Sequence, residues 1–352
     1  KNLRIIMQKV NNNIAVNYRH SAIGEVLWML PIIKSISEHH KKKIILFTRP
    51  ETKAKVLLEN EDYIKEITYL PFRKGIYQFK EILLQTSILK KKNINYFYVL
   101  EEIVRPCLAA RLAGVKNIFG YGKKKQRKYL TQSKYLNDNI YNKHEYVRGL
   151  KFLKLLKIKH TNIKKVKISL NFNKLKKAKK KYAKFKKKIF LSLQASEKFR
   201  TWPIGYFIEL VNLILNNNQK YIIFLLCDKS FFEQLKKIKL KIKKNKISKI
   251  LSLEKYSFDK IKYLMKISDF YVGCDSGPAM LSDYLGTKTF VLYGATAPLP
   301  YENKIIPIYA KSKSKRYKKN ELIVQNHQKK NSYMKYIYPL KVYKKIKSSL
   351  KK

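Results

Sequence analysis

The chain has 352 residues, enough for two domains of ordinary size. Hydrophobic residues make up 45% of it, which excludes an intrinsically disordered chain. The formal net charge of +56 would favour nucleic-acid binding if the basic residues were gathered in one place. They are instead spread along the chain, and lysine, isoleucine, asparagine and tyrosine are all abundant, as an AT-rich genome would impose. We therefore expect no specific nucleic-acid partner, although a basic surface attracts anionic lipid.

The cysteines point to a reducing compartment. Cys107, Cys227 and Cys274 are far apart and form no metal-binding or redox pair. Cys227 and Cys274 lie in apolar, strand-like surroundings, so we expect free thiols and a cytoplasmic location. No signal peptide is expected, and the longest apolar runs are much shorter than the roughly 18 residues of a membrane span.

Strands and helices alternate along the first half of the chain. Strands are predicted over residues 13–18, 44–47, 67–70, 96–100 and 117–121, and helices over 26–36, 56–58, 79–89, 108–112 and 144–156. Residues 123–141 are polar and basic with little periodicity, which predicts an exposed loop. The alternation of strand and helix is typical of a parallel α/β sheet.

The pattern repeats after a lysine-rich helix that we predict over residues 174–188, so the domain boundary is placed near residue 180. Strands are predicted over residues 189–193, 221–226, 247–251, 270–272 and 289–293, and helices over 206–215, 231–242, 258–267, 279–285 and 339–350. Two doubly wound halves imply a cleft between them, with ligands at the carboxyl ends of the strands.

The turn Asp275-Ser276-Gly277 stands between a buried strand and a helix that has Pro278 in its first turn. Two interpretations of it are open. Asp275 and Ser276 cap the helix, which is the commoner role of such residues. Alternatively, the free N–H groups of the helix bind an anion beyond the strand end.

Two further segments follow predicted strands and are expected at the same cleft. One ends in Gly24-Glu25 and offers a carboxylate, and the other, residues 194–203, is a cationic loop that contains Arg200. A carboxylate can remove the proton of an attacking hydroxyl, while cationic groups and a helix N-terminus stabilise the negative charge of a leaving group. Together the three segments suit transfer from a donor with a diphosphate leaving group.

Four blocks resemble glycosyltransferase family 9, the ADP-heptose:lipopolysaccharide heptosyltransferases. They are Arg19-x-Ser21-x-Ile23-Gly24-Glu25 through Pro31, Arg200-Thr201-Trp202-Pro203, Asp275-Ser276-Gly277-Pro278 through Thr296, and the tail from Met334 to Ile346. The resemblance implies the GT-B fold, in which two Rossmann-like, doubly wound parallel-sheet domains face a cleft. It implies an acceptor domain over residues 1–180, a nucleotide-sugar donor domain over 181–335 and a closing helix over 336–352.

The roles of the family's residues carry over by position. Glu25 stands where the family has the Asp proposed as general base, and Arg200 where it has a Lys that contacts the diphosphate. Ser276 and Gly277 are implied to offer backbone N–H groups to the diphosphate. Asp275 is implied to orient the loop or to contact hydroxyls of the donor sugar.

Three further positions belong to this comparison. Ser196 either adds a hydroxyl contact to phosphate or is an ordinary loop residue. Tyr256 either stacks on the nucleobase or covers the surface. Met280 replaces a His that is frequent in the family and is expected to pack in the core. The resemblance implies no metal and no resident cofactor.

The resemblance implies an inverting, metal-independent glycosyltransferase. Its first candidate reaction moves heptose from ADP-heptose onto a lipopolysaccharide core or related lipid-linked glycan acceptor. Two alternatives are open: a catalytically impaired member that binds nucleotide or glycan, motivated by Glu25 and Met280, and a transferase that uses a different nucleotide sugar. We expect the protein in the cytoplasm, with peripheral contact to the anionic inner face of the inner membrane.

Overall fold

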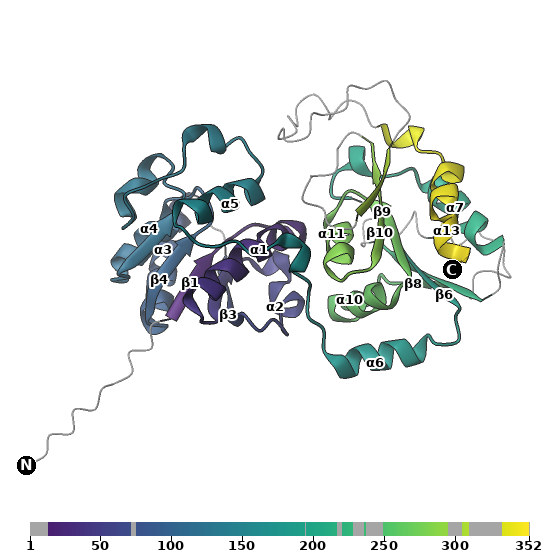
Figure 1. Ribbon diagram of the computed structural model, residues 1–352, viewed down its shortest axis with the longest axis horizontal. Helices are drawn as coiled ribbons and strands as arrows, with labels where there is room; N and C mark the ends of the chain where they lie inside the picture. Colours follow the sequence, from purple (N-terminus) through teal and green to yellow (C-terminus); the bar gives the residue numbers. More distant parts are fainter. Residues whose placement is uncertain are drawn as a thin grey trace, which may run out of the picture. The chain divides into compact units, whose positions relative to one another are not determined.

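The computed structural model describes residues 13–71, 75–193, 195–216, 220–227, 236, 249–294, 305–309 and 333–351. Two compact units divide the chain (Figure 1). The first comprises the residues up to Ser21, Trp28–Lys55 and Glu61–Thr161. The second comprises Ala22–Leu27, Val56–Asn60 and the residues from Asn162 on. Two short segments of the N-terminal half therefore pack with the second unit.

The first unit is built on a five-stranded sheet in the order β3-β2-β1-β4-β5. The strands are β1 (Asn13–Asn17), β2 (Ile44–Thr48), β3 (Ile64–Tyr69), β4 (Ile94–Val99) and β5 (Asn117–Gly120). All neighbours are parallel, and Val16 of β1 lies opposite Leu46 of β2 and Tyr98 of β4. These strands are rich in β-branched and aromatic residues because both faces of a parallel sheet are covered.

Helices cover that sheet and close its core. They are α1 (Ile23–His40), α2 (Ala54–Leu57), α3 (Gln78–Lys91), α4 (Arg105–Leu112) and α5 (Glu145–Leu155). In the core, the rings of Phe47 and Phe97 meet edge to face with centroids 6.1 Å apart. Gly114 follows α4 with φ of +74°, a left-handed conformation that favours glycine after a helix.

The stretch over residues 123–141 is largely exposed and has neither α-helix nor strand, as its sequence predicts, but it is more ordered than a plain loop. It contains two short 3₁₀ turns, Lys124–Tyr129 and Asp138–Ile140, and buries Gln126, Leu130 and Leu136. The side chain of Gln126 donates hydrogen bonds to the carbonyls of Glu101 and Ile103 and accepts one from the N–H of Gly122. The hydrogen bonds of one buried amide side chain thus hold this segment in place. Hydrophobic periodicity gives no sign of such contacts.

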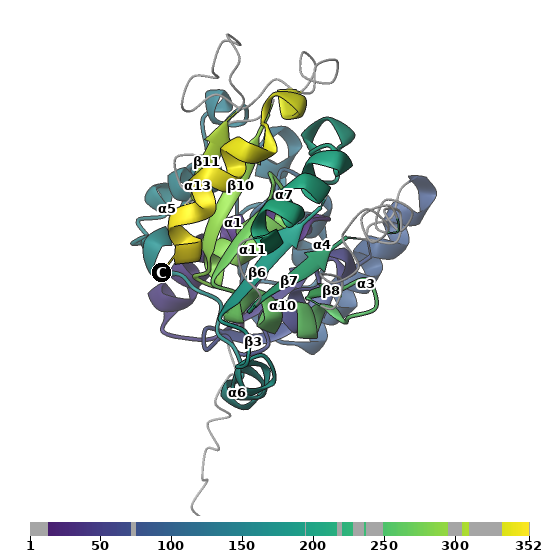
Figure 2. The same cartoon turned by 90° about the vertical axis from the view of Figure 1, so that its right-hand side faces the viewer.

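The second unit is built on a six-stranded parallel sheet in the order β11-β10-β9-β6-β7-β8, seen with its helices in Figure 2. The strands are β6 (Lys187–Ser192), β7 (Tyr221–Leu226), β8 (Ile250–Ser252), β9 (Phe270–Cys274), β10 (Lys288–Tyr293) and β11 (Ile305–Tyr309). Strand β11 was not predicted, because Pro307 lies at its centre. Proline is tolerated there because β11 is an edge strand and one side of it needs no ladder.

The helices of this unit are α6 (Phe172–Lys181), α7 (Ile204–Asn216), α10 (Phe258–Ile267), α11 (Gly277–Tyr284) and α13 (Pro339–Lys351). α13 packs on α7 and buries Val342 and Ile346 in the core. α6 ends seven residues before the predicted end at Lys188, because Lys187 already pairs with Tyr221 of β7. Of the predicted helix over residues 231–242 the structure describes only Lys236, and Thr296 lies outside the described residues.

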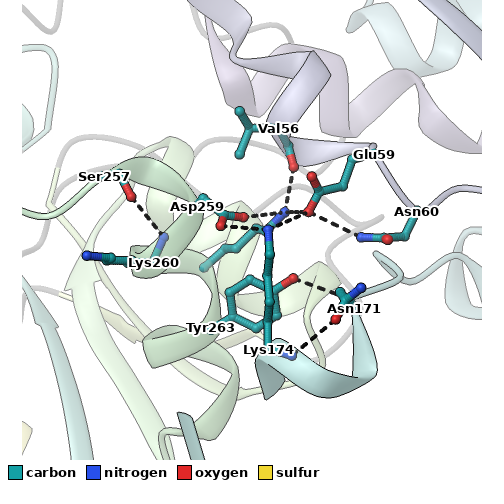
Figure 3. A network of polar contacts seen from close by, with 10 residues as sticks. Val56, Glu59, Asn60, Asn171, Lys174, Ser257, Asp259, Lys260 and Tyr263 are labelled. Carbon is teal, nitrogen blue, oxygen red and sulfur yellow. Dashed lines mark hydrogen bonds and ion pairs between the residues drawn. The ribbon is translucent and has the colours of Figure 1, made fainter. Parts of the chain in front are cut away.

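A buried lysine attaches the segment Val56–Asn60 to the rest of the second unit (Figure 3). The ammonium group of Lys262, whose side chain is inaccessible to solvent, donates to the carbonyl oxygen of Val56 and lies 2.8 Å from Glu59 Oε1. It also lies 3.2 Å from Asp259 Oδ1, and Lys174 contacts the same two carboxylates.

Both units are thus doubly wound parallel α/β sheets, as predicted. None of the helices within the described ranges has the length and apolar character that crossing a bilayer requires.

Candidate functional site: the turn at the start of α11 and a polar pocket

The turn between β9 and α11 places Ser276 at the N-cap of the helix. Its backbone is extended, with φ of −161° and ψ of 168°, and its side chain does not cap α11. The hydroxyl instead donates to the carbonyl oxygen of Cys274 at 3.1 Å. The interpretation of Ser276 as a side-chain cap is therefore wrong, because the hydroxyl is turned back to the strand. The backbone N–H groups of the first helical turn receive no oxygen from it.

Arg200 lies beside this turn, at the end of a short 3₁₀ turn that follows β6, Lys198–Arg200. Its Nη1 atom is 3.7 Å from Asp275 Oδ2, and its Nη2 atom donates to Ser196 Oγ at 2.9 Å. The side chain is 25% exposed, and its Nε atom is buried with no hydrogen-bond partner in the described part of the chain. The structure thus brings Ser196, Arg200 and Asp275 together, with one guanidinium donor left for a further acceptor.

The loop that carries Arg200 is anchored by Trp202, whose side chain is buried. The indole Nε1 donates to the carbonyl oxygen of Ile337 at 2.8 Å, and the backbone N–H donates to Cys274 Sγ at 3.3 Å. Burial raises the pKa of the Cys274 thiol to about 12, so this group is a neutral thiol at neutral pH. Trp202 therefore fixes the loop both to β9 and to the segment before α13, which positions Arg200.

Gly24 meets the start of α11 backbone to backbone. A Cβ atom on Gly24 would lie 3.4 Å from the Cα atom of Gly277, and one on Gly277 would lie 3.4 Å from the Gly24 nitrogen. A Cβ atom at either position would be at the lower limit of ordinary van der Waals contact, so the two backbones lie close together. Met280 is buried, and its Cγ lies 3.9 Å from the same Gly24 position, which confirms the expected core packing.

Glu25 is in the first turn of α1, directly after Gly24. Its Oε2 atom accepts a hydrogen bond from the backbone N–H of Ala22 at 3.1 Å. This is the carboxylate half of a capping box, and it holds the side chain at the start of the helix. The structure thus gives Glu25 a local role and places its helix start beside Gly277.

Tyr256 contacts residues other than those around Arg200. Its N–H donates to the carbonyl oxygen of Leu253, and its side chain meets that of Tyr182. Burial, with the hydroxyl of Tyr256, raises the pKa of Tyr182 to about 12. These contacts do not join Tyr256 to the group of Arg200, Ser196 and Asp275.

A polar pocket of about 330 Å³ that the sequence analysis missed lies in the first unit. It is lined by Tyr18, Arg19, His20, Ser21, Arg49, Leu100, Glu101, Glu102, Ile103, Tyr121, Glu145 and Arg148. Most of these residues follow the ends of β1, β2, β4 and β5, and two come from α5. The available signal was a polar residue within two positions after each of these strands, which places its side chain at the carboxyl edge of the sheet.

One wall of the pocket is a buried ion-pair network around Arg19. The guanidinium pairs with Glu81 of α3, and its Nε lies 3.2 Å from Glu101 Oε1. Burial raises the pKa of Glu101, and the neighbouring Arg19 partly offsets this effect. The Nη2 atom of Arg19 is buried with no hydrogen-bond partner in the described part of the chain. This wall therefore contains a buried donor without a partner, which is costly.

The other wall centres on Glu145 and Arg148 of α5. Arg148 pairs with Glu102, and its Nη2 lies 3.3 Å from Glu145 Oε1. His20 Nε2 lies 3.5 Å from the same oxygen, but burial lowers the pKa of His20 below its usual value. Within the described residues, Arg148 Nε and the hydroxyl of Tyr121 also lack hydrogen-bond partners. The pocket thus combines carboxylate acceptors with unused N–H and O–H donors.

No group of three or more His, Cys, Asp or Glu side chains within the described ranges could hold a metal ion.

Comparison with known proteins agrees with this architecture. The model of glycosyltransferase family 9 (heptosyltransferase) matches residues 86–336. The comparison with curated proteins gives no match. Among solved structures, the chain is similar to ADP-heptose lps heptosyltransferase II of E. coli, at 15% identity and a TM-score of 0.73, with 96% of this chain and 98% of that one covered.

Two further structures are similar. The glycosyl transferase family 9 protein of Veillonella parvula has 14% identity, 97% coverage of each chain and a TM-score of 0.75. E. coli heptosyltransferase WaaC with ADP has 14% identity, 96% coverage of this chain, 98% of that one and a TM-score of 0.63. These likenesses confirm the predicted GT-B fold. Because the family model spans more than half of the sequence, the chain belongs to glycosyltransferase family 9 and is a glycosyltransferase.

Proposed function

We propose that the protein transfers a sugar from a nucleotide diphosphate donor to a lipid-linked glycan, with heptose from ADP-heptose as the first candidate. The observation that carries this proposal is the group of Arg200, Ser196 and Asp275 at the N-terminus of α11. A guanidinium with an unused N–H and the N–H groups of a helix start are suited to bind phosphate oxygens. One structural relative was solved with ADP, which supports an adenine nucleotide.

Departure of the nucleotide leaves negative charge on the diphosphate. Arg200 is held by Ser196 and Asp275 before any donor binds, so its positive charge needs little rearrangement to stabilise that developing charge. Asp275 is proposed to orient the guanidinium of Arg200. We propose that no resident metal is needed, because Arg200 and the start of α11 supply the positive field.

Glu25 is the proposed general base. Inversion at the anomeric carbon requires a base that deprotonates the acceptor hydroxyl as it attacks opposite the leaving group. The hydrogen bond from the N–H of Ala22 orients the carboxylate. Gly24 brings the start of this helix to Gly277, where the leaving diphosphate is proposed to sit.

The acceptor sugar is proposed to bind in the pocket of the first unit. Arg19, Tyr121 and Arg148 each offer an unused donor, and Glu101 and Glu145 offer acceptors. A sugar presents both hydroxyl hydrogens and oxygens, so it can satisfy both kinds of group at once.

The three buried free cysteines agree with the cytoplasmic location that we propose.

The test is to incubate the protein with a de-acylated acceptor and, in separate reactions, ADP-heptose and UDP-, GDP- and CMP-sugars. Release of ADP above the rate without acceptor would support the proposal. Release of another nucleotide would show that the donor is a different nucleotide sugar. A thermal-shift series with the same compounds ranks their affinities independently of turnover.

One observation favours a second candidate, a binding protein without transferase activity. Glu25 already has a structural role as acceptor for the N–H of Ala22, so its presence does not require catalysis. This candidate expects nucleotide binding with no acceptor-dependent release of ADP. A measured turnover would exclude it.

A further inference from the structure

Helix α3 and the residue before it expose an apolar stripe to solvent. The stripe consists of Tyr77, Phe79, Leu83 and Leu84, whose exposed fractions are 54, 65, 48 and 39%. Phe79 and Leu83 are four residues apart and therefore share one face of the helix. The opposite side of α3 supplies the core contacts, where Glu81, Gln85 and Leu89 are buried. The stripe is thus additional to the residues that fold this helix onto the sheet.

The surroundings of the α3 stripe are positively charged. Lys80, Lys90 and Lys91 of the same helix are exposed, and the ammonium group of Lys80 lies 5.8 Å from the centre of the Tyr77 ring. Glu81, the acidic residue of α3, is buried and paired with Arg19 and Arg105. The helix therefore presents apolar and cationic groups to solvent and no carboxylate.

The neighbouring helix also exposes a leucine beside a basic residue. α3 packs against α4, whose Leu112 is 51% exposed and adjoins an exposed Arg111. Exposed aromatic and leucine side chains beside basic residues are typical of surfaces that lie in a bilayer interface. Several large apolar side chains exposed along one helix are also a common mark of an interaction site.

We propose that the α3 stripe docks on the surface of a bilayer that contains anionic phospholipid. The apolar side chains would enter the interface, and the lysines would bind lipid phosphates, an attraction that the net charge of +56 reinforces. Charge complementarity is the reason to prefer an anionic bilayer over a second copy of this chain, which carries the same positive charge. Binding to lipid needs no transfer reaction, so this inference goes beyond the proposed function.

The buried face of the same helix contacts one residue that lines the polar pocket. Arg19, which lines the pocket, pairs with Glu81 from the inner face of α3. Docking through α3 would keep the protein at the membrane, where lipid-linked acceptors are concentrated.

The test is sedimentation with vesicles of phosphatidylcholine that contain phosphatidylglycerol, compared with vesicles of phosphatidylcholine alone. The double variant Phe79→Ser/Leu83→Ser should bind the anionic vesicles about tenfold more weakly than the unaltered protein. Leu340→Ser is the matched control, because Leu340 is a helical leucine of 49% exposure in the second unit. It should bind as the unaltered protein does.

Two measurements make the outcome decisive. Thermal unfolding of the double variant should match that of the unaltered protein, since both side chains are exposed. Turnover on a de-acylated, water-soluble acceptor should also be unchanged, so loss of lipid binding is distinguished from failure of the transferase proposal. Equal vesicle binding by the double variant, or equal loss in Leu340→Ser, would overturn the inference. It would also be overturned if light scattering showed a dimer that the double variant dissociates without a change in lipid binding.

Discussion

Arg200 and Asp275 face each other at 3.7 Å between Nη1 and Oδ2, one from the loop after β6 and the other from the turn after β9. Because β6 and β9 are neighbouring parallel strands, their carboxyl ends bring these two residues together. The pair is more than a quarter exposed on its acidic side, so it contributes little to stability. The ion pair instead fixes the orientation of the Arg200 guanidinium.

Arg200→Ala should lower kcat/KM by about a hundredfold, since it removes a donor to the charge that develops on the leaving diphosphate. Arg200→Lys should recover part of the loss, because the charge is kept while the forked geometry is lost. Lys198→Ala is the control, as Lys198 is an exposed cation in the same short turn. Steady-state kinetics with varied donor measures all three, and an equal loss in Lys198→Ala would reduce the role of Arg200 to net charge.

Glu25→Gln should lower kcat by about a hundredfold or more while calorimetry shows unchanged binding of ADP. The amide oxygen can still accept the N–H of Ala22, so the start of α1 should be preserved. Glu25→Ala is the comparison that also removes this hydrogen bond and should cost about 1 kcal/mol of stability. Full turnover by Glu25→Gln would contradict the assignment of the base.

The strands were predictable because burial on both faces selects apolar, β-branched runs that a single sequence reveals. Strand β11 escaped prediction since Pro307 argues against a strand, and only the sheet order shows that it is an edge. The end of α6 was also misplaced, because pairing of Lys187 with Tyr221 is a tertiary interaction that overrides helix propensity.

The two candidate sites differ in the same way. Arg200 and the Asp275 turn could be identified because each belongs to a compact motif. The pocket of the first unit was missed because Arg19, Glu101 and Arg148 are scattered over more than a hundred positions. The order β2-β1-β4-β5 brings their strand ends together, and sequence spacing does not contain that order.

Gly273→Ala should destabilise the second unit by about 2 kcal/mol, because the new Cβ would lie 2.4 Å from the hydroxyl of Tyr271 and 3.0 Å from Ser192 Cβ. Both neighbours are buried and have little room to move. Gly205→Ala is the control, since nothing lies within 4 Å of its Cβ and alanine favours the helix α7. Denaturant unfolding should show a loss for the first variant and none for the second.

Lys262→Met should cost about 2 kcal/mol, because it removes the donor to the buried carbonyl of Val56 and leaves Glu59 with only the more distant ammonium group of Lys174. Lys260→Met on the same helix is the control, since Lys260 is exposed. Equal unfolding free energies for the two variants would contradict the role of Lys262 in attaching residues 56–60.

The same network predicts a dependence on acid. Burial raises the pKa of Asp259, but its hydrogen bonds from Lys174 and Lys262 outweigh this effect and hold the pKa below the ordinary value of 3.8. A depressed pKa in the folded state gives stability that is present above pH 3.8 and is lost as the pH falls through the folded value. Asp259→Asn should therefore flatten the acid limb of the stability curve below about pH 4, measured by urea unfolding at each pH.

Tyr121→Phe should leave the fold intact and raise the KM for the acceptor several-fold. Its hydroxyl is buried without a hydrogen-bond partner among the described residues, so its removal relieves an unsatisfied group and should not lower stability. Binding of a sugar would give that hydroxyl a partner, and the variant loses this gain. Tyr98→Phe is the control: the hydroxyl of Tyr98 lies 2.7 Å from His40 Nε2, away from the residues that line the pocket. It should lose about 1 kcal/mol of stability with no change in the acceptor KM. If Tyr121→Phe instead gained stability and kept the same KM, the acceptor sugar would not reach this wall of the pocket.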